Sequence, residues 1–378
     1  MPSIPGIYCR RLCSVVATAL LLTSPNAGLT AQGSQDAIAI DSSALQRLGE
    51  QFVANNRAGG LSVAIVRDDT VRYFNFAGGP SACAQSPNQN TVYEIGSITK
   101  VFSSLLLANA VAEGRVELQD DIRKYLTEEY PNLQRDGTPV RLVHLVETTS
   151  GLPDNIPDLT SLVQTEGPNR APRAIVERWQ RYGARQLLTD LHHVTLDHTP
   201  GVTSRHSNVA ATLVGFILEK VFAQPYEKLI QTYIEEPFGM NSGTGSGRGR
   251  AAVAGCNAAG VVMPAIDSRY IRSAGGLRYS SADMARFARA QLASTSAALR
   301  LSQQATGESA GTGLGFNWRM SPGRDGALVL RASGGTFGSS SYIEVRPDAG
   351  YALVLLTNQA GVESMLYDLA VQIRRAVR

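Results

Sequence analysis

Ser97 and Lys100 have the residue types and the spacing of a nucleophile and its base. They lie three residues apart at the start of an apolar run, residues 101–110, whose period is helical. Residues i and i+3 share one face of a helix, so the two side chains can meet there, and a neutral lysine can accept the hydroxyl proton. The N-terminal end of a helix also favours the negative charge that develops. Arginine could not replace this lysine, because it does not deprotonate, and the chain has only four lysines against 31 arginines.

The spacing by itself also fits a helix-capping serine beside a solvated lysine. Its context favours the catalytic interpretation. Residues 91–100, Thr-Val-Tyr-Glu-Ile-Gly-Ser-Ile-Thr-Lys, resemble the catalytic segment of serine β-lactamases and penicillin-binding proteins, specifically the class C β-lactamase and esterase branch. Further matches follow in that family's order at residues 116–126, 142–154, 200–208, 236–240, 275–283 and 333–336. The resemblance therefore covers nearly the whole chain beyond its N-terminal segment.

The second motif departs from the pattern of that family. The usual Tyr-x-Asn is here His206-Ser207-Asn208. The tyrosine of the family is a general acid/base, and an imidazole can also accept a proton near neutral pH. The resemblance therefore implies that His206 is a second base, used in deacylation, and that Asn208 orients Lys100 or the substrate. The alternative is a loop histidine in a site that has decayed.

The third motif departs as well. The family has Lys or His, then Thr or Ser, then Gly, whereas this chain has Ala332-Ser333-Gly334. The missing cation holds a substrate carboxylate in β-lactamases and cell-wall peptidases. Arg331 is adjacent on the expected strand, so we expect its side chain on the other face, where it cannot replace that cation. An ester or amide without the carboxylate is thus the expected substrate, in preference to a β-lactam.

The resemblance also implies the rest of the site. Ser333, Gly334 and Asn208 are expected to bind substrate. The backbone N–H groups of Ser97 and Gly335 are expected to form the oxyanion hole. Because these donors belong to the backbone, the side-chain departures at positions 206 and 332 do not remove them.

Two competing motifs carry less weight. Residues 307–311 fit Gly-x-Ser-x-Gly, the nucleophile elbow of another hydrolase fold, but that elbow needs a downstream histidine and none follows His206. The histidines at positions 192, 193 and 198 lack the helical spacing and the nearby cysteines of a metal site. The sequence therefore implies neither a metal nor an organic cofactor.

The elements that must position these residues form a recognisable order. Strand-like segments occupy residues 61–67, 71–76, 327–331, 341–345 and 351–356, with helices at 43–55 and 361–378, and residues 101–235 have a mostly helical period. This order predicts an α+β fold: an antiparallel sheet flanked by N- and C-terminal helices, with an inserted, mostly helical domain. The expected boundaries are residues 32–112 with 271–378 for the sheet domain and 113–270 for the insertion, whose segment 241–260 reads as a loop.

Composition limits the remaining classes of function. The 378 residues are 43% hydrophobic and 18% charged, with a net charge of +3, which excludes a disordered chain and gives no indication of nucleic-acid binding. No apolar window long enough to span a membrane occurs beyond the N-terminus. We therefore expect a small-molecule or peptide substrate as the partner; the oligomeric state is not indicated.

Residues 1–31 have the pattern of a signal peptide. Arg10 and Arg11 precede a short apolar run and then small residues. Export to the periplasm or the medium would leave Cys83 and Cys256 as the remaining cysteines. In an oxidising compartment they can form one disulfide, and two free buried thiols are the alternative.

Together these features predict an exported serine hydrolase that acts through an acyl-enzyme on Ser97. The alternative is a catalytically impaired relative that binds peptidoglycan peptides or a protein partner.

Overall fold

The computed structural model describes residues 41–243, 251–305, 313–323 and 326–377. These described residues belong to one compact unit. The predicted signal peptide at 1–31 and the Gly-x-Ser-x-Gly sequence at 307–311 lie outside the described residues. Within the described part, no helix is long and apolar enough to cross a membrane.

A seven-stranded antiparallel sheet joins the two ends of the chain. Its order is β2-β1-β11-β10-β9-β8-β7. The strands are β1 (Gly60–Arg67), β2 (Thr70–Ala77), β7 (Leu314–Gly315), β8 (Trp318–Pro322), β9 (Leu328–Gly335), β10 (Ser340–Arg346) and β11 (Tyr351–Thr357). The first strand pairs with the last, because Leu61 lies opposite Thr357 and Arg67 opposite Tyr351. Two short ladders lie outside this sheet: β3 (Val92–Glu94) with β6 (Arg278–Ser280), and β4 (Gln134–Arg135) with β5 (Thr138–Pro139).

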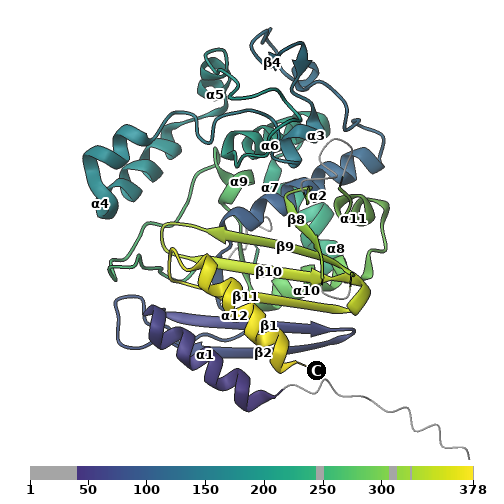
Figure 1. Ribbon diagram of the computed structural model, residues 1–378. Coiled ribbons are helices and arrows are strands. Elements are labelled where there is room, and N and C mark those ends of the chain that lie inside the picture. Colours follow the sequence, from purple (N-terminus) through teal and green to yellow (C-terminus); the bar gives the residue numbers. More distant parts are fainter. Residues whose placement is uncertain (1–40, 244–250, 306–312, 324–325, 378) are drawn as a thin grey trace, which may run out of the picture. The chain divides into compact units, whose positions relative to one another are not determined.

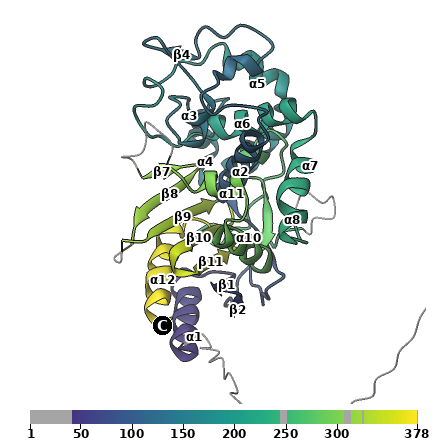
Figure 2. The same ribbon diagram turned by 90° about the vertical axis from the view of Figure 1, so that its right-hand side faces the viewer.

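Helices α1 (Ser42–Asn56) and α12 (Glu363–Ala376) cover one face of the sheet and pack against each other. Both are amphipathic, and each buries one stripe on the strands, which is what keeps an amphipathic helix on a sheet. Leu45 and Phe52 of α1 and Leu366 and Leu369 of α12 belong to the same hydrophobic cluster. Figure 1 shows the pair, purple and yellow, on the near side of the sheet, and Figure 2 shows the same layer edge-on.

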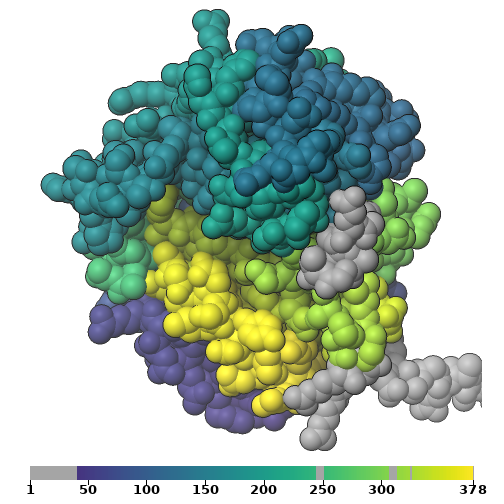
Figure 3. All heavy atoms as spheres, turned by 45° about the horizontal axis from the view of Figure 1, so that its top comes forward, coloured from purple at the N-terminus to yellow at the C-terminus, as the bar shows by residue number. Residues whose placement is uncertain are grey.

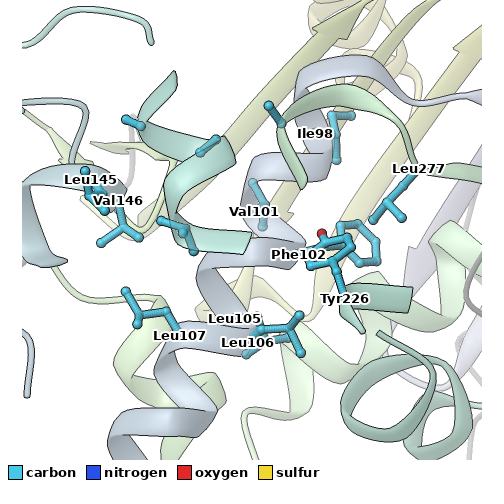
Figure 4. Close-up of a cluster of buried hydrophobic side chains, with 14 of the residues drawn as sticks. Ile98, Val101, Phe102, Leu105, Leu106, Leu107, Leu145, Val146, Tyr226 and Leu277 are labelled. Atoms are coloured by element: carbon cyan, nitrogen blue, oxygen red, sulfur yellow. The ribbon is translucent and has the colours of Figure 1, made fainter. Parts of the chain in front are cut away.

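The other face of the sheet packs on α10 (Ser281–Ala293) and on the turn Gly96–Ile98 that precedes α2 (Thr99–Ala112). The centre of this side is α2, which is apolar nearly all round and buried along most of its length, as a fully enclosed helix must be. Figure 4 shows Val101, Phe102 and Leu105 of α2 within this core. The remaining helices are α3 (Leu142–Val146), α4 (Thr160–Arg181), α5 (Ala184–Leu191), α6 (Asn208–Phe222), α7 (Tyr226–Ile230), α8 (Glu236–Phe238), α9 (Arg272–Gly275) and α11 (Ala297–Ser302).

The predicted α+β fold is confirmed, and the predicted terminal helices and strands are present with bounds that differ by a few residues. The hydrophobic core runs without a break from the sheet into the insertion. The division at residues 112/113 and 270/271 therefore stays a prediction from the sequence. Strands β3, β6, β7 and β8 were not predicted, because each has only two to five residues and no clear alternation.

A disulfide joins Cys83 to Cys256. Both residues are buried, and the amide of Asn358, just after β11, donates a hydrogen bond of 2.8 Å to the carbonyl of Cys83. The backbone N–H of Cys256 donates to the carbonyl of Asn358 at 3.1 Å. The cross-link therefore joins the segment after β2 to the loop at the end of the insertion, and both cysteines lie against the end of β11.

Removing this disulfide is expected to destabilise the protein. The cross-link closes a loop of 173 residues, so a Cys83→Ala/Cys256→Ala variant should lose about 2–5 kcal/mol of unfolding free energy. Urea unfolding of the oxidised proteins measures the difference. As a control, dithiothreitol should shift the wild-type midpoint and leave that of the double variant unchanged. Equal midpoints for the two oxidised proteins would contradict the prediction.

Candidate active site

Ser97 lies in a tight turn, residues Gly96–Ile98, that leads directly into α2. Strand β9 approaches the backbone of this turn so closely that only glycine fits. Gly96 has a φ of +50°, and a Cβ there would lie 2.6–2.8 Å from the backbone of Gly335. A Cβ at Gly334 would collide with the carbonyl of Ile95 and lie 2.8 Å from the Ser97 nitrogen. The backbones of Ser97 and Gly335, the two predicted oxyanion-hole residues, are thus brought together.

The amine of Lys100 is held by three oxygen atoms. Its Nζ lies 3.0 Å from the Ser97 Oγ, 2.8 Å from the Asn208 Oδ1 and 2.8 Å from the carbonyl oxygen of Ala274. The amide and carbonyl oxygens can only accept hydrogen bonds. A neutral amine can donate one hydrogen bond to each of them and direct its lone pair at the serine hydroxyl. The geometry suits a lysine that accepts the proton of Ser97.

Burial makes the neutral form of Lys100 accessible. The side chain is 3% exposed, and desolvation lowers the pKa of Lys100 to about 7, with the charge of Asp154 acting in the opposite direction. A base whose pKa lies near neutrality is half deprotonated where an enzyme works, and it still accepts a proton strongly.

Asn208 is the first residue of α6, and its neighbours fix its amide. Its Nδ2 donates to the Oδ1 of Asn155 at 3.1 Å, which leaves Oδ1 for Lys100. Ser207 caps the helix: its Oγ accepts from the N–H of Ala210 at 3.0 Å and donates to the carbonyl of Pro153 at 2.7 Å. The predicted role of Asn208 in orienting Lys100 agrees with these contacts.

The carbonyl of Ala274 is positioned by a buried cluster of hydroxyls behind α2. Ser103 donates to the carbonyl of Ser273 at 2.6 Å and lies 2.7 Å from the hydroxyl of Tyr226. The Oγ of Ser273 donates in turn to the carbonyl of Ala211 on α6 at 3.0 Å. Helix α9 is therefore fastened to both α2 and α6.

His206 lies at the mouth of the same cavity as Ser97 and Lys100. Its Nδ1 is 2.7 Å from the Oδ1 of Asp154. Burial raises the pKa of Asp154, but the hydrogen bond and charge of His206 outweigh this, so that the pKa of Asp154 lies below its ordinary value. The carboxylate thus orients the imidazole and leaves Nε2 for a substrate or a water molecule.

The third motif lies on β9. Ser333 is exposed and lines the cavity, whereas Ala332 is 7% exposed and lines it from the inner face of the strand. The expectation for Arg331 needs correction. Its Nε contacts Glu344 at 3.2 Å on the far face, as alternation predicts, yet the same side chain also lines the cavity.

The cavity has a volume of about 740 Å³. It lies between the insertion and the sheet edge, and Figure 3 views this side with the insertion (teal) above α12 (yellow).

The residues that sequence reasoning missed are Asp154, Asn155, Ala274 and Glu94. Asp154 is the last residue of segment 142–154, which matches the family, but the sequence assigned it no role in the site. Buried Glu94 accepts hydrogen bonds from the Thr336 hydroxyl at 3.0 Å and from the N–H of Ile266 at 2.6 Å, and burial raises the pKa of Glu94. It fixes the turn after Gly335, a long-range contact that no local pattern indicates.

Comparison with known proteins identifies the family. Residues 45–377 match the Beta-lactamase family. The chain belongs to that family. The recognition of a β-lactamase and penicillin-binding-protein relative is thereby confirmed, and its relatives in the Beta-lactamase family are serine hydrolases.

Two relatives illustrate the range of this family. The chain is 27% identical over 203 residues to a β-lactamase of Pseudomonas fluorescens, and this match covers 53% of this chain and 48% of that protein. It is 30% identical over 158 residues to the D-alanyl-D-alanine-carboxypeptidase/endopeptidase AmpH of Escherichia coli K12, which covers 42% of this chain and 38% of AmpH. The chain thus spans less than half the length of these curated relatives.

Solved structures show the same fold. A class C β-lactamase of Rhodobacter sphaeroides superposes with a TM-score of 0.69 at 19% identity, covering 88% of this chain and 98% of that one. The octameric penicillin-binding protein homologue of Pyrococcus abyssi gives a TM-score of 0.70 at 23% identity. The superposition covers 88% of this chain and 77% of that one. At these identities the likeness establishes the fold.

Proposed function

We propose that this member of the Beta-lactamase family is an exported serine hydrolase that forms an acyl-enzyme on Ser97. The observation that carries the proposal is the buried Lys100 amine, 3.0 Å from the Ser97 Oγ, with two further oxygens that can only accept hydrogen bonds. A merely structural lysine needs no such arrangement. Relatives that are hydrolases of amide bonds, such as AmpH, support the same reaction class.

In acylation, the Ser97 Oγ attacks the substrate carbonyl carbon while its proton passes to Lys100 Nζ. The carbonyl oxygen becomes an oxyanion, held by the N–H groups of Ser97 and Gly335. When the tetrahedral intermediate collapses, the bond to the leaving group breaks, and the leaving alcohol or amine takes the proton from Lys100. The products of this step are the ester of Ser97 and the free leaving group.

In deacylation, water attacks the ester carbonyl. We assign the acceptance of the water proton to His206, which Asp154 orients at 2.7 Å. Collapse of the second intermediate releases the carboxylic acid and restores the Ser97 hydroxyl with that proton.

The rival function is a catalytically impaired relative that binds peptidoglycan peptides or a protein partner, and the replacement of the family's tyrosine and cation by His206 and Ala332 favours it. Intact mass spectrometry separates the two functions. A fluorophosphonate should add one covalent adduct to native protein and none to heat-denatured protein or to Ser97→Ala. A panel of activated esters and β-lactams then identifies which acyl groups react. A native protein that acquires no adduct from any of these reagents is the binder, not the hydrolase.

A His206→Ala variant is expected to slow deacylation about 100-fold or more, because general bases typically contribute that much. Acylation should change far less, so the acyl-enzyme should accumulate and appear as a pre-steady-state burst. His193→Ala, an exposed histidine of the same domain, is the matched control. An unchanged deacylation rate in His206→Ala would make the histidine a bystander.

Export to the periplasm or the medium belongs to the same proposal and rests on residues 1–31. N-terminal sequencing of protein expressed from the full chain tests it. Cleavage after a small residue near position 27 or 31 is expected, and an intact N-terminus would contradict export by this signal.

A further inference from the structure

Two cavities adjoin at the edge of the sheet. The first, of about 740 Å³, contains Ser97 and Lys100. The second, of about 430 Å³, lies against α12. Both are lined by Arg331 and Tyr367, so they share a wall.

The pairing of β9 leaves its edge beside the two cavities uncovered by β8. Strand β8 pairs with β9 only at residues 328–331. Beyond this point β9 keeps its β10 partner up to Gly335, and its other edge is not covered by β8. Ser333, on this open edge, lines the first cavity together with Tyr367 of α12. A substrate seated at Ser97 would reach the second cavity by crossing this edge, past Arg331 and Tyr367, which line both cavities.

The walls of both cavities are positively charged. Several arginines line them: Arg205, Arg319 and Arg331 in the first, and Arg331, Arg346, Arg374 and Arg375 in the second. Within the described residues, no aspartate or glutamate lines either cavity. A cleft lined by one sign of charge concentrates ligands of the opposite sign.

Three carboxylates behind these walls offset part of the charge. Asp154 lies 2.7 Å from His206, which lines the first cavity. Asp197 pairs with Arg205 at 2.5 Å. Fully buried Glu344 lies between Arg331, at 3.2 Å, and Arg374. These pairs fix the guanidinium groups in place, and an excess of positive charge remains.

Arg319 is the clearest indication of an anionic ligand. It lies directly opposite Arg331 in the β8–β9 ladder, and like charges in that position repel each other across a strand pair. Arg331 Nη1 also donates to the Oγ of Ser321 at 2.6 Å. Ser321 lies on β8, as Arg319 does, so this hydrogen bond holds the Arg331 guanidinium beside that strand. Arg319 is exposed and has no ion pair within the described residues. A carboxylate or phosphate between the two forks would relieve the repulsion and gain two charge-assisted contacts.

We infer that the substrate of Ser97 is an extended anion with at least two negatively charged groups. One group binds at Arg319 and Arg331, and another binds in the second cavity at Arg374 and Arg375. The inference rests on the proposed hydrolase function and names its substrate class. It also reverses the expectation of a neutral substrate drawn from Ala332, because the positive charge lies on the opposite face of β9 and beyond it.

Binding to Ser97→Ala protein tests the inference without turnover. The probes are tricarballylate and tripolyphosphate as polyanions, with acetate and inorganic phosphate as their single-group counterparts, measured by calorimetry. The polyanion of the preferred chemistry should bind at least about tenfold more tightly than its counterpart, and Arg319→Ala should remove about tenfold of that affinity. Which pair shows the preference distinguishes carboxylate from phosphate.

Arg375→Ala tests the extension into the second cavity. It should weaken the polyanion and leave the single-group anion unchanged, because Arg375 lines only the second cavity. Arg185→Ala, an exposed arginine on α5 that lines neither cavity, is the matched control. Polyanions that bind no more tightly than single anions, or an affinity unaffected by both Arg319→Ala and Arg375→Ala, would overturn the inference.

Hydrolysis gives an independent readout. The 4-nitrophenyl ester of succinic acid should be turned over by wild-type protein with a higher kcat/KM than the matched butyrate ester, and Arg319→Ala should lower only the former. If polyanions bind but no ester or fluorophosphonate reacts with Ser97, the hydrolase function fails and the anion site stands. If both esters react equally and polyanions do not bind, the hydrolase stands and the anion site fails.

Discussion

Replacing Ser97 by alanine is expected to lower the turnover of an activated ester by at least about 1,000-fold, the scale of effect seen when a nucleophile is removed. The fold should persist, because among the described residues the hydroxyl hydrogen-bonds only to Lys100, and the side chain lies at the cavity surface. Steady-state kinetics and far-UV circular dichroism check the two parts of this result.

Ser309→Ala is the matched control for Ser97→Ala, since Ser309 is the serine of the competing Gly-x-Ser-x-Gly sequence. It should retain wild-type turnover. If Ser97→Ala stays within about tenfold of wild type while Ser309→Ala loses activity, the nucleophile is Ser309 and the assignment of the site is wrong.

Lys100→Met should be as damaging as Ser97→Ala. Methionine fills a similar volume but cannot accept the proton, so acylation loses its base. Residues that act as a unit are not additive, and the Ser97→Ala/Lys100→Met double variant should therefore be no slower than either single variant. Lys124→Met, an exposed lysine on the insertion, serves as the control. A double variant much slower than both singles would show that the two side chains act separately.

The pH dependence follows from the same lysine. Because the pKa of Lys100 is about 7, the fraction of neutral amine rises as the pH passes through that value. The rate of acylation should thus increase with pH below about 7 and level off above it. The folded protein also binds fewer protons than the unfolded chain between this pKa and the ordinary 10.5 of lysine, so the buried amine should make unfolding free energy rise with pH across that range. In Lys100→Met, neither the residual acylation rate nor the unfolding free energy should show this dependence on pH. If the acylation rate of that variant still rises with pH below about 7, Lys100 is not the cause of the rise.

The pH profile of ester turnover does not test the role of His206 by itself. Both bases act in the same ester turnover, so an acidic limb alone does not distinguish them. The deacylation rate of His206→Ala, measured separately from acylation, is the observation that does.

Local patterns were enough to predict five strands of the sheet, its flanking helices and the Ser97/Lys100 pair, because each of these depends on residues close together in sequence. The remaining contacts of the site come from distant segments. Ala274 acts through a backbone carbonyl, which carries no side-chain signature, and Asn155 acts by holding another amide. Arg331 shows a further limit: strand alternation correctly predicts its contact with Glu344, but it does not reveal that the same side chain also lines the cavity of Ser97.

The pairing of the first strand with the last has a consequence for how the chain is made. The hydroxyl of Thr357 in β11 donates a hydrogen bond to the carbonyl of Gly60 in β1, and these residues are 297 positions apart. During synthesis the β1–β2 hairpin thus emerges long before the strand that completes its inner edge. For that period it exposes an unpaired, apolar edge, the kind of surface that pairs with other chains. Truncated or stalled products of this protein are therefore expected to aggregate, and the nascent chain to depend on chaperones until β11 has been synthesised.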